Sequence, residues 1–247
     1  MIESTFLHLP RTGPATEQRL WKNGILTWQD FLRAESMRGF SADKKAACNE
    51  VLIASARALH AGDSAFFRGS LPSVQHWRLY PQFQDDTVYV DIETSWHGDI
   101  TVLGIYDGKT VKQFTRGQNL SADSIREHLQ GKLIVTYNGA SFDLPIIERC
   151  FPGVLPKVPH FDTMHLARRL GYRGGLKALE RELGIARPDT LEGMSGQDAL
   201  QLWALYKSTG EQEHLQKLLA YNEEDIVNLV RVATMLVSQA QARFFIR

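Results

Sequence analysis

Residues 87–94 read TVYVDIET, an apolar run that is interrupted by Asp91 and Glu93. The β-branched and aromatic residues of this run are typical of a short buried strand. Side chains alternate across a strand, so residues two apart share a face and these two carboxylates lie side by side. Such a pair is costly to desolvate unless a divalent cation lies between the two groups. The alternative is a strand end that emerges into solvent, where both carboxylates are simply hydrated.

Two further acidic residues are candidates for the same site as Asp91 and Glu93. Asp143 follows an apolar strand and a turn in LIVTYNGASFDLP, residues 133–145, where it could also cap the helix that begins there. Asp225 lies in LLAYNEEDIVNL, residues 218–229, four residues after Tyr221. The two side chains therefore share one face of a helix. A surface helix with a run of acidic residues is the alternative for this segment.

The order of these motifs resembles a known family. A strand with D-x-E, a turn with N-G-x-x-F-D and a helix with Y-x-x-x-D follow one another as in the tyrosine branch of the DEDD exonuclease superfamily. Within it, residues 86–236 resemble the bacterial ribonuclease H-like exonuclease group of YprB-type proteins. The matching segments are VDIET, ITVLGIYDG, YNGASFDLPII, FDTMHLARRL, GGLKALERELGI and LLAYNEEDIVNL.

The resemblance implies a 3′-to-5′ exonuclease that uses two divalent cations, Mg²⁺ or Mn²⁺, and releases nucleoside 5′-monophosphates. Carboxylate oxygens suit such hard cations, and a pair of cations can stabilise the attacking and the leaving oxygen of an in-line displacement. The four metal-binding acids of the family correspond to Asp91, Glu93, Asp143 and Asp225. Tyr221 corresponds to the tyrosine that orients the attacking water.

Residues near these acids are candidates for substrate contacts. Phe142 could stack on a terminal base, or it could be a core aromatic. Asn138 could contact the substrate or hold the turn before Asp143. Trp96 and His97 follow the D-x-E strand, where this superfamily often places substrate contacts, or they are ordinary exposed loop residues.

A short basic stretch and one more acid complete the candidates. The stretch comprises Arg168, Arg169, Arg173 and Lys177, which could meet phosphates or form a solvated helix face. Asp162 is best interpreted as the cap of the helix that starts near residue 163, with a supporting role near the acids as the alternative.

The pattern after residue 85 predicts an α/β fold, a ribonuclease H-like mixed sheet flanked by helices over residues 86–247. We expect strands at 87–93 and 132–138, and a hairpin of 100–106 and 110–116 around the turn signal Asp107-Gly108. Helices are expected at 121–130 and, from about 143, over most of the remaining chain. The last, from roughly 211 to 240, has apolar residues at helical spacing.

The sequence pattern predicts a small helical domain over residues 1–62 and an irregular connection over residues 63–85. Thr27 and Asp30 predict a capping box at the start of one helix, while Ser41 and Gly62 mark the ends of a longer one. FLHLPRTGPATEQRLWKNGILTWQDFL resembles a helix-hairpin-helix module, whose turn presents backbone amides to a phosphate. The first glycine of that turn is replaced, and Arg11 could offer a charge instead. A structural role for the segment is the alternative.

The composition restricts the possible functions less than the motifs do. Lys and Arg number 28 and Asp and Glu number 28, so contact with nucleic acid must rely on local patches or on bound metal ions rather than on bulk charge. Cys48 and Cys150 lack metal-binding or disulfide spacing, which favours a reducing cytoplasm. No apolar run predicts a membrane span, and no secretory signal is expected.

The leading hypothesis is therefore an exonuclease on single-stranded or 3′-ended nucleic acid. The helix-hairpin-helix resemblance and the proofreading-like motifs favour DNA over RNA. A structure-specific endonuclease of the same fold and a non-catalytic nucleic-acid-binding or scaffold protein are the alternatives.

Overall fold

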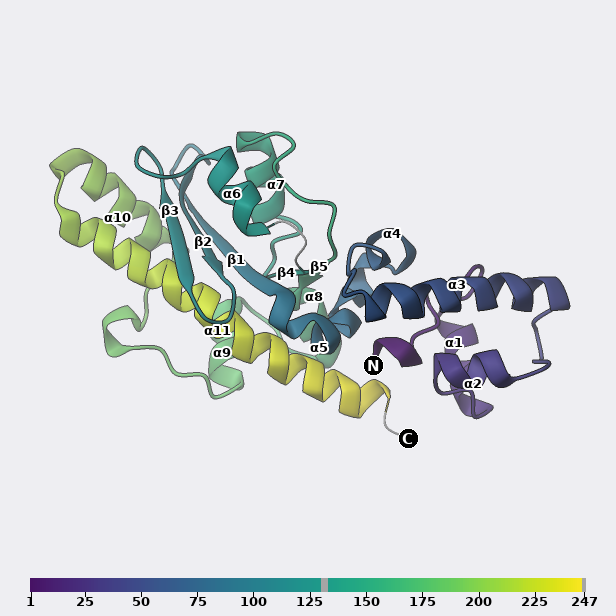
Figure 1. Ribbon diagram of the computed structural model, residues 1–247. Coiled ribbons are helices and arrows are strands. Elements are labelled where there is room, and N and C mark those ends of the chain that lie inside the picture. The colour runs from purple at the N-terminus through teal and green to yellow at the C-terminus, as the bar shows by residue number, and fades with distance from the viewer. Residues whose placement is uncertain (130–132, 246–247) are drawn as a thin grey trace.

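The computed structural model describes residues 1–129 and 133–245, which form a five-stranded mixed sheet with helices on both faces (Figure 1). The strand order is β3-β2-β1-β4-β5, in which β2 runs antiparallel to β1 and β3 while β4 runs parallel to β1 and β5. This arrangement confirms the predicted α/β fold. The strands are β1 (Thr87–Thr94), β2 (Ile100–Tyr106), β3 (Val111–Thr115), β4 (Leu133–Thr136) and β5 (His160–Asp162).

The hairpin between β2 and β3 forms where the turn signal predicts it. The Asp107 carboxylate accepts the N–H groups of Lys109 and Thr110 at 2.9 and 2.7 Å, which closes the turn. The strand β5 was not predicted, because three residues are too few to show a period in the sequence. It nevertheless extends the sheet beyond β4 and delivers Asp162 to its edge.

The central strand β1 divides its side chains between the two faces of the sheet. Val88, Val90 and Ile92 pack against α6 (Ala122–Leu129) and α7 (Asp143–Cys150) in one hydrophobic cluster. Tyr89 faces the opposite side, where α8 (Thr163–Leu170), α9 (Leu176–Glu182) and α11 (Gln212–Phe244) lie. Because the alternation continues, Asp91 and Glu93 also point to the face that α11 covers.

The long helix α11 crosses this face and continues beyond the sheet (Figure 1). It packs against β1 and β2, and at its start against α10 (Gly196–Thr209). Buried residues recur along it every three or four positions, as Leu215, Leu218, Leu229 and Leu236 illustrate. The predicted helix is confirmed, with a C-terminal extension to Phe244.

The N-terminal segment is helical, as predicted, with α1 (Pro14–Lys22), α2 (Trp28–Arg33) and α3 (Ala42–His60). Thr27 and Asp30 form the expected capping box, and the Ser41 hydroxyl accepts the N–H of Lys44. The part before the Arg11–Gly13 turn contains the three-residue 3₁₀ helix η1 (Ile2–Ser4) in place of an α-helix. A full helix-hairpin-helix would need a longer first helix there.

Residues 63–85 are more ordered than the predicted irregular connection. They form α4 (Phe67–Ser70), η2 (Ser73–Leu79), α5 (Tyr80–Phe83) and η3 (Gln84–Asp86). Trp77 and Tyr80 are buried, and they belong to a hydrophobic cluster that also holds Phe6 of the N-terminal segment and Leu229 of α11. The prediction failed because burial here comes from distant partners rather than from a local period. The N-terminal segment thus shares one core with the sheet.

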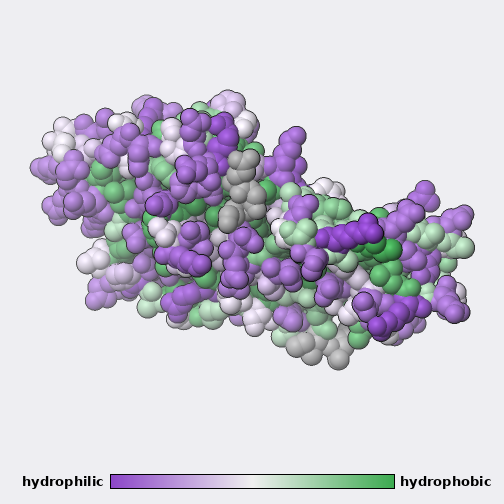
Figure 2. Space-filling view, viewed as in Figure 1, coloured by the Kyte–Doolittle hydropathy of each residue, from purple (hydrophilic) through white to green (hydrophobic). Residues whose placement is uncertain are grey.

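Figure 2 shows a face that is mostly hydrophilic, with hydrophobic residues in small patches between polar ones. None of the described helices combines the length and the hydrophobicity that crossing a membrane requires. Residue 130 of the predicted helix, residue 132 of the predicted strand and residues 246–247 lie outside the described residues.

Candidate metal centre

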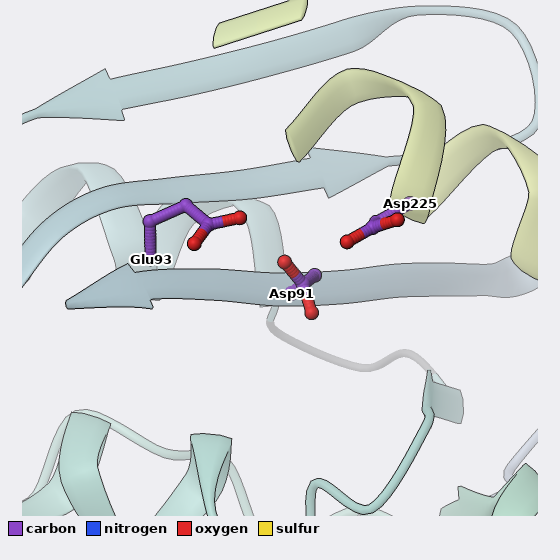
Figure 3. Close-up of side chains that lie close together, drawn as sticks. All are labelled: Asp91, Glu93 and Asp225. Carbon is purple, nitrogen blue, oxygen red and sulfur yellow. The ribbon is translucent and has the colours of Figure 1, made fainter. Parts of the chain in front are cut away.

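Three of the predicted acids come together on the α11 side of the sheet. Asp91 and Glu93 project from β1, and Asp225 projects towards them from α11 (Figure 3). Each carboxylate offers one oxygen that lies within 4.8 Å of the other two. Strand alternation and the packing of α11 across β1 therefore create a group of oxygen ligands of the kind that divalent cations prefer.

Burial and mutual repulsion disfavour ionisation of these acids. The pKa of Asp91 lies well above its usual value because the group is buried and because Asp143, Asp225 and Glu93 surround it with negative charge. Burial likewise raises the pKa of Glu93, and the charge of Asp225 adds to this effect. Among the described residues, no hydrogen bond to the Glu93 carboxylate forms. Such groups gain most from a cation that neutralises them.

Asp143 lies beside this group without joining it. Its Oδ1 accepts the backbone N–H of Ile92 at 3.0 Å, at the point where β4 has ended and no longer pairs with β1. The capping alternative does not hold, because Phe142 is the N-cap of α7 and no side chain caps that helix. Burial raises the pKa of Asp143 to about 7, against the effect of the Ile92 hydrogen bond.

Asn222 links Asp91 to the outer strand β3. Its Nδ2 donates to Asp91 Oδ2 at 3.0 Å, while its Oδ1 accepts from Gln113 Nε2 at 3.1 Å. Asp91, Gly104 and Gln113 form one row across β1, β2 and β3. Since Gly104 has no side chain, the Asn222 amide fits above it between the other two. The row fixes the orientation of the Asp91 carboxylate.

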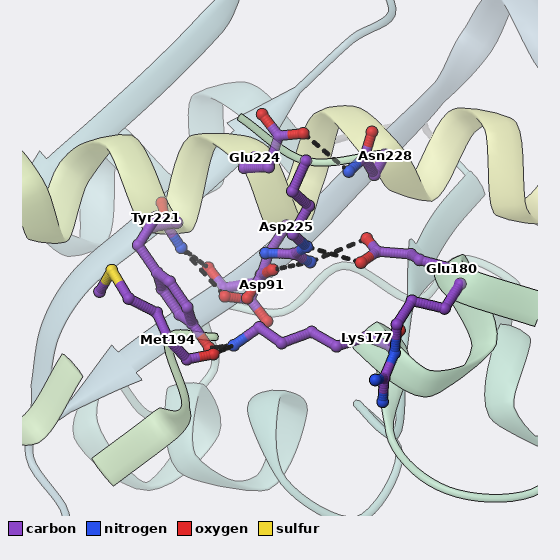
Figure 4. A network of polar contacts seen from close by, with 11 residues as sticks. Asp91, Lys177, Glu180, Met194, Tyr221, Glu224, Asp225 and Asn228 are labelled. Atoms are coloured by element: carbon purple, nitrogen blue, oxygen red, sulfur yellow. Dashed lines mark hydrogen bonds and ion pairs between the residues drawn. The ribbon is translucent and has the colours of Figure 1, made fainter. Parts of the chain in front are cut away.

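Two cations approach the acids from the segment 176–194. Lys177 on α9 donates to the Tyr221 hydroxyl and to the carbonyl of Met194 (Figure 4). Arg187 donates to both oxygens of Glu180, at 2.6 and 2.8 Å, and to Asp225. Both side chains of the Arg187–Glu180 pair are buried. These contacts offset part of the negative charge and hold Asp225 in place.

A cavity of about 400 Å³ opens beside the acids. Asp91, Glu93, Tyr221 and Asp225 line it, together with Gln197 and Leu200 at the start of α10 and with Phe142. Phe142 is 43% exposed, so it lies at the cavity rather than in the core, contrary to the core alternative. The volume falls within the range of small-molecule sites and suits a single nucleotide.

The other predicted contact residues are not among those that line this cavity. Asn138 adopts a left-handed conformation with φ 64°, and its N–H donates to Asp162 at 2.8 Å, which is the turn role. Asp162 also caps α8 through the N–H of Met164. Trp96 is 61% exposed. His97, in the turn after β1, lines a separate cavity of about 410 Å³.

Arg11 lies in the N-terminal segment. Its carbonyl accepts from Lys44 Nζ at 3.3 Å, and its side chain is exposed. Its backbone is left-handed, with φ 53°, at the position of the missing turn glycine.

Sequence reasoning missed four polar residues of the centre: Gln113, Glu180, Arg187 and Asn222. Asn222 stands directly after Tyr221, and a polar residue on the inward side of a helix was a usable signal. Lys177 was included only as part of a basic stretch. Glu180 and Arg187 carry no such signal, because Asp225, the residue to which Arg187 connects them, lies more than 35 residues away along the chain.

The chain belongs to the RNase H superfamily, whose sequence profile matches residues 88–237. The nucleases of this superfamily use divalent metal ions, and the acidic group supplies fitting ligands.

One curated relative is the "Uncharacterized protein YprB" of Bacillus subtilis (strain 168), which is 37% identical over 108 residues. The match covers 39% of this chain and 25% of the relative, so the chain spans about a quarter of that protein's length. A solved structure described as "apo form of the nuclease" has a TM-score of 0.48 and 16% identity. The match covers 68% of this chain and 79% of the chain in that structure.

Proposed function

We propose that this chain is a metal-dependent 3′-to-5′ exonuclease that acts on single-stranded or 3′-ended nucleic acid, with DNA as the favoured substrate. The observation that carries the proposal is the group of ligand oxygens of Asp91, Glu93 and Asp225 within 4.8 Å of one another, in an RNase H fold. The products would be nucleoside 5′-monophosphates.

The donor set fits two Mg²⁺ or Mn²⁺ ions, because it consists of carboxylates alone and they repel one another. Such ions, when bound, supply a reactive water and stabilise the charge of the transferred phosphate and the departing 3′ oxygen. Asp91, Glu93 and Asp225 would hold them. Asp143 is proposed as the fourth ligand, since its charge already acts on Asp91.

Tyr221 would orient the attacking water rather than remove its proton. Its pKa lies above the usual value because of burial and of the negative charge of Asp225, Glu93 and Asp91, so the phenol stays protonated at neutral pH. Lys177 donates to the phenol oxygen. The hydrogen of the phenol is therefore free to donate to a water molecule in the cavity.

Lys177 has a second use in this scheme. An ammonium has three donors, of which Tyr221 and Met194 take two. The third could bind an oxygen of the scissile phosphate and stabilise the negative charge that develops there. Phe142, which lines the same cavity and is exposed, could stack on the terminal base.

The remaining predicted contacts are proposed as follows. Trp96 and His97 would meet the strand beyond the cavity, and Arg11 would meet a backbone phosphate. Asn138 would act mainly through the turn that it forms with Asp162. The members of the basic stretch have different surroundings, since Lys177 donates to the Tyr221 hydroxyl while Arg169 lines a different cavity.

The test uses 5′-labelled single-stranded DNA and RNA oligomers with Mn²⁺, with Mg²⁺ and with chelator. We expect a metal-dependent ladder that shortens from the 3′ end, which Asp225→Ala abolishes and Glu223→Ala, at an exposed position two residues away, does not. Cleavage of a closed circle would indicate the endonuclease instead. Metal-independent binding with every substrate intact would indicate a non-catalytic protein.

A further inference from the structure

A smaller cavity, apart from the two described above, lies where the N-terminal segment meets the ends of α8 and α11. Its volume is about 140 Å³, and its lining includes Glu17, Trp21, Arg78, Arg169, Arg243 and Phe244. None of the catalytic acids lines it. The C-terminal end of α11 runs towards the N-terminal segment and brings these distant parts of the chain together (Figure 1).

The charges around this cavity do not balance. Three guanidinium groups face one carboxylate, and that carboxylate is fully engaged. Glu17 accepts from Arg78 at 2.8 and 3.0 Å and from the backbone N–H of Phe6 at 2.7 Å. Arg169 and Arg243 form no ion pair with any carboxylate of the described residues. The buried Nε of Arg78 also lacks a hydrogen-bond partner there.

The mutual repulsion of these cations is visible at Arg169. Its pKa lies below the usual value, first because of burial and then because of the positive charges of Arg78 and Arg243, which Glu17 offsets only in part. An anion in the cavity would relieve this repulsion. A cavity of this size holds a few waters, each of which takes about 30 Å³ in the liquid, or one small anion.

The arrangement of the arginine side chains indicates which kind of anion fits the cavity. The Arg169 guanidinium lies 4.1 Å from the centre of the Phe244 ring, which supports its flat face. Only one of its donors, Nη1, has a hydrogen-bond partner among the described residues, the side-chain oxygen of Gln75 at 3.5 Å. Arg243 lies over the same ring at 5.8 Å, and only one of its donors, Nη1, has a partner, the carbonyl of Leu170. Two guanidinium edges beside one cavity match the several oxygens of a phosphate group.

We propose that this cavity binds one phosphate group, which Arg169 and Arg243 hold directly and Arg78 attracts by its charge. The phosphate comes either from free phosphate or from the backbone of a nucleic acid. Binding of free phosphate requires neither the metal centre nor nuclease activity, so its test is independent of the proposed function.

The first experiment measures binding of inorganic phosphate by calorimetry, without metal and at constant ionic strength. We expect Arg169→Gln combined with Arg243→Gln to weaken the affinity on the order of tenfold or more, because each arginine supplies charge-assisted hydrogen bonds. Arg169→Lys should bind more weakly than the wild type, since it retains the charge but loses the paired donors. The matched control is Arg231→Gln, an exposed arginine on α11.

Each outcome of the phosphate titration either supports or contradicts the proposed site. Equal phosphate binding by the wild type and the double variant, with circular dichroism that confirms the fold of both, would overturn the proposal. So would the absence of phosphate binding in the wild type. Weaker binding in the double variant and unchanged binding in Arg231→Gln would support it.

The second experiment identifies the source of the phosphate. Affinity for a single-stranded oligonucleotide is measured in chelator over a range of salt concentrations. If the backbone supplies the phosphate, the double variant should bind more weakly, and the slope of log affinity against log salt should fall by about one. Lost phosphate binding with unchanged oligonucleotide affinity would assign the cavity to free phosphate. A double variant that changes neither property contradicts both forms of the proposal.

Discussion

The Asn222 side chain lies directly over Gly104, in space that a larger residue at position 104 would fill. A Cβ atom there would come within 3.0 Å of Asn222 Cγ and 3.1 Å of Ile226 Cδ1. Asn222 in turn donates to Asp91 and accepts from Gln113. The absence of one methyl group on β2 thus allows α11 to fix the orientation of an acid on β1.

Gly104→Ala should therefore reduce both activity and metal affinity, although it replaces none of the acids of the metal centre. The added methyl displaces Asn222 and releases Asp91, and groups that orient metal ligands typically contribute 10–100-fold to activity or metal affinity. We expect a loss of roughly that size in both, measured by oligonucleotide cleavage and by Mn²⁺ titration. Gly69→Ala is the control, because an added Cβ there meets no atom within 4 Å. An undiminished rate in Gly104→Ala would show that Asn222 does not orient Asp91.

Three of the acids that lie together could be grouped from periods in the sequence. Asp91 and Glu93 share a strand face, and Asp225 and Tyr221 share a helix face, so local patterning was enough to group them. The strands β1 to β4 and the long α11 followed from the same patterns. Phe142, by contrast, was weighed as a core residue, because an aromatic next to a buried strand gives no sign of its exposure.

Contacts between distant segments could not be predicted. Arg187, which Glu180 holds, reaches Asp225 only because the segment that follows α9 lies beside α11, and Gln113 reaches Asn222 only across two strands. The core position of Trp77 has the same origin. A single sequence records which faces are apolar, but it does not record which faces meet.

Lys177→Met should reduce turnover by roughly a hundredfold, the typical effect of removing one donor that stabilises developing charge. The variant also leaves the Tyr221 hydroxyl without its Lys177 partner. Because the two residues act as a unit, Lys177→Met with Tyr221→Phe should cost less than the sum of the single losses. Single-turnover cleavage measures this, with Lys217→Met, at an exposed lysine on α11, as the control. Additive losses would argue that the two residues act separately.

Glu93→Gln should stabilise the metal-free protein by about 1 kcal/mol while abolishing activity. The change removes one of several repelling buried charges from a side chain that has no hydrogen-bond partner among the described residues. Urea unfolding with and without Mn²⁺ provides the measurement, and Mn²⁺ should stabilise the wild type but much less the variant. Glu223→Gln is the matched exposed control. A metal-free variant that is clearly less stable than the wild type would mean that Glu93 has a structural role.

His8 should lower the stability of the fold as the pH drops from about 6.5 towards 4, whereas the raised pKa values of the metal-centre acids act in the opposite direction. Burial, with the nearby charge of Arg78, lowers the pKa of His8 from 6.5 to about 4, so in this window the unfolded chain binds a proton that the folded chain does not. This difference corresponds to ~3 kcal/mol of stability that is complete above pH 6.5 and lost at the acidic end. Neither ring nitrogen of His8 has a hydrogen-bond partner among the described residues, and the ring lies against Trp28 and Phe67. In urea unfolding, the stability of His8→Phe relative to the wild type should therefore rise as the pH falls from 7 to 5, whereas that of His60→Gln, at an exposed position, should not. An unchanged pH profile in His8→Phe would mean that other buried groups carry the dependence, of which His160, also with a pKa of about 4, is the first to examine.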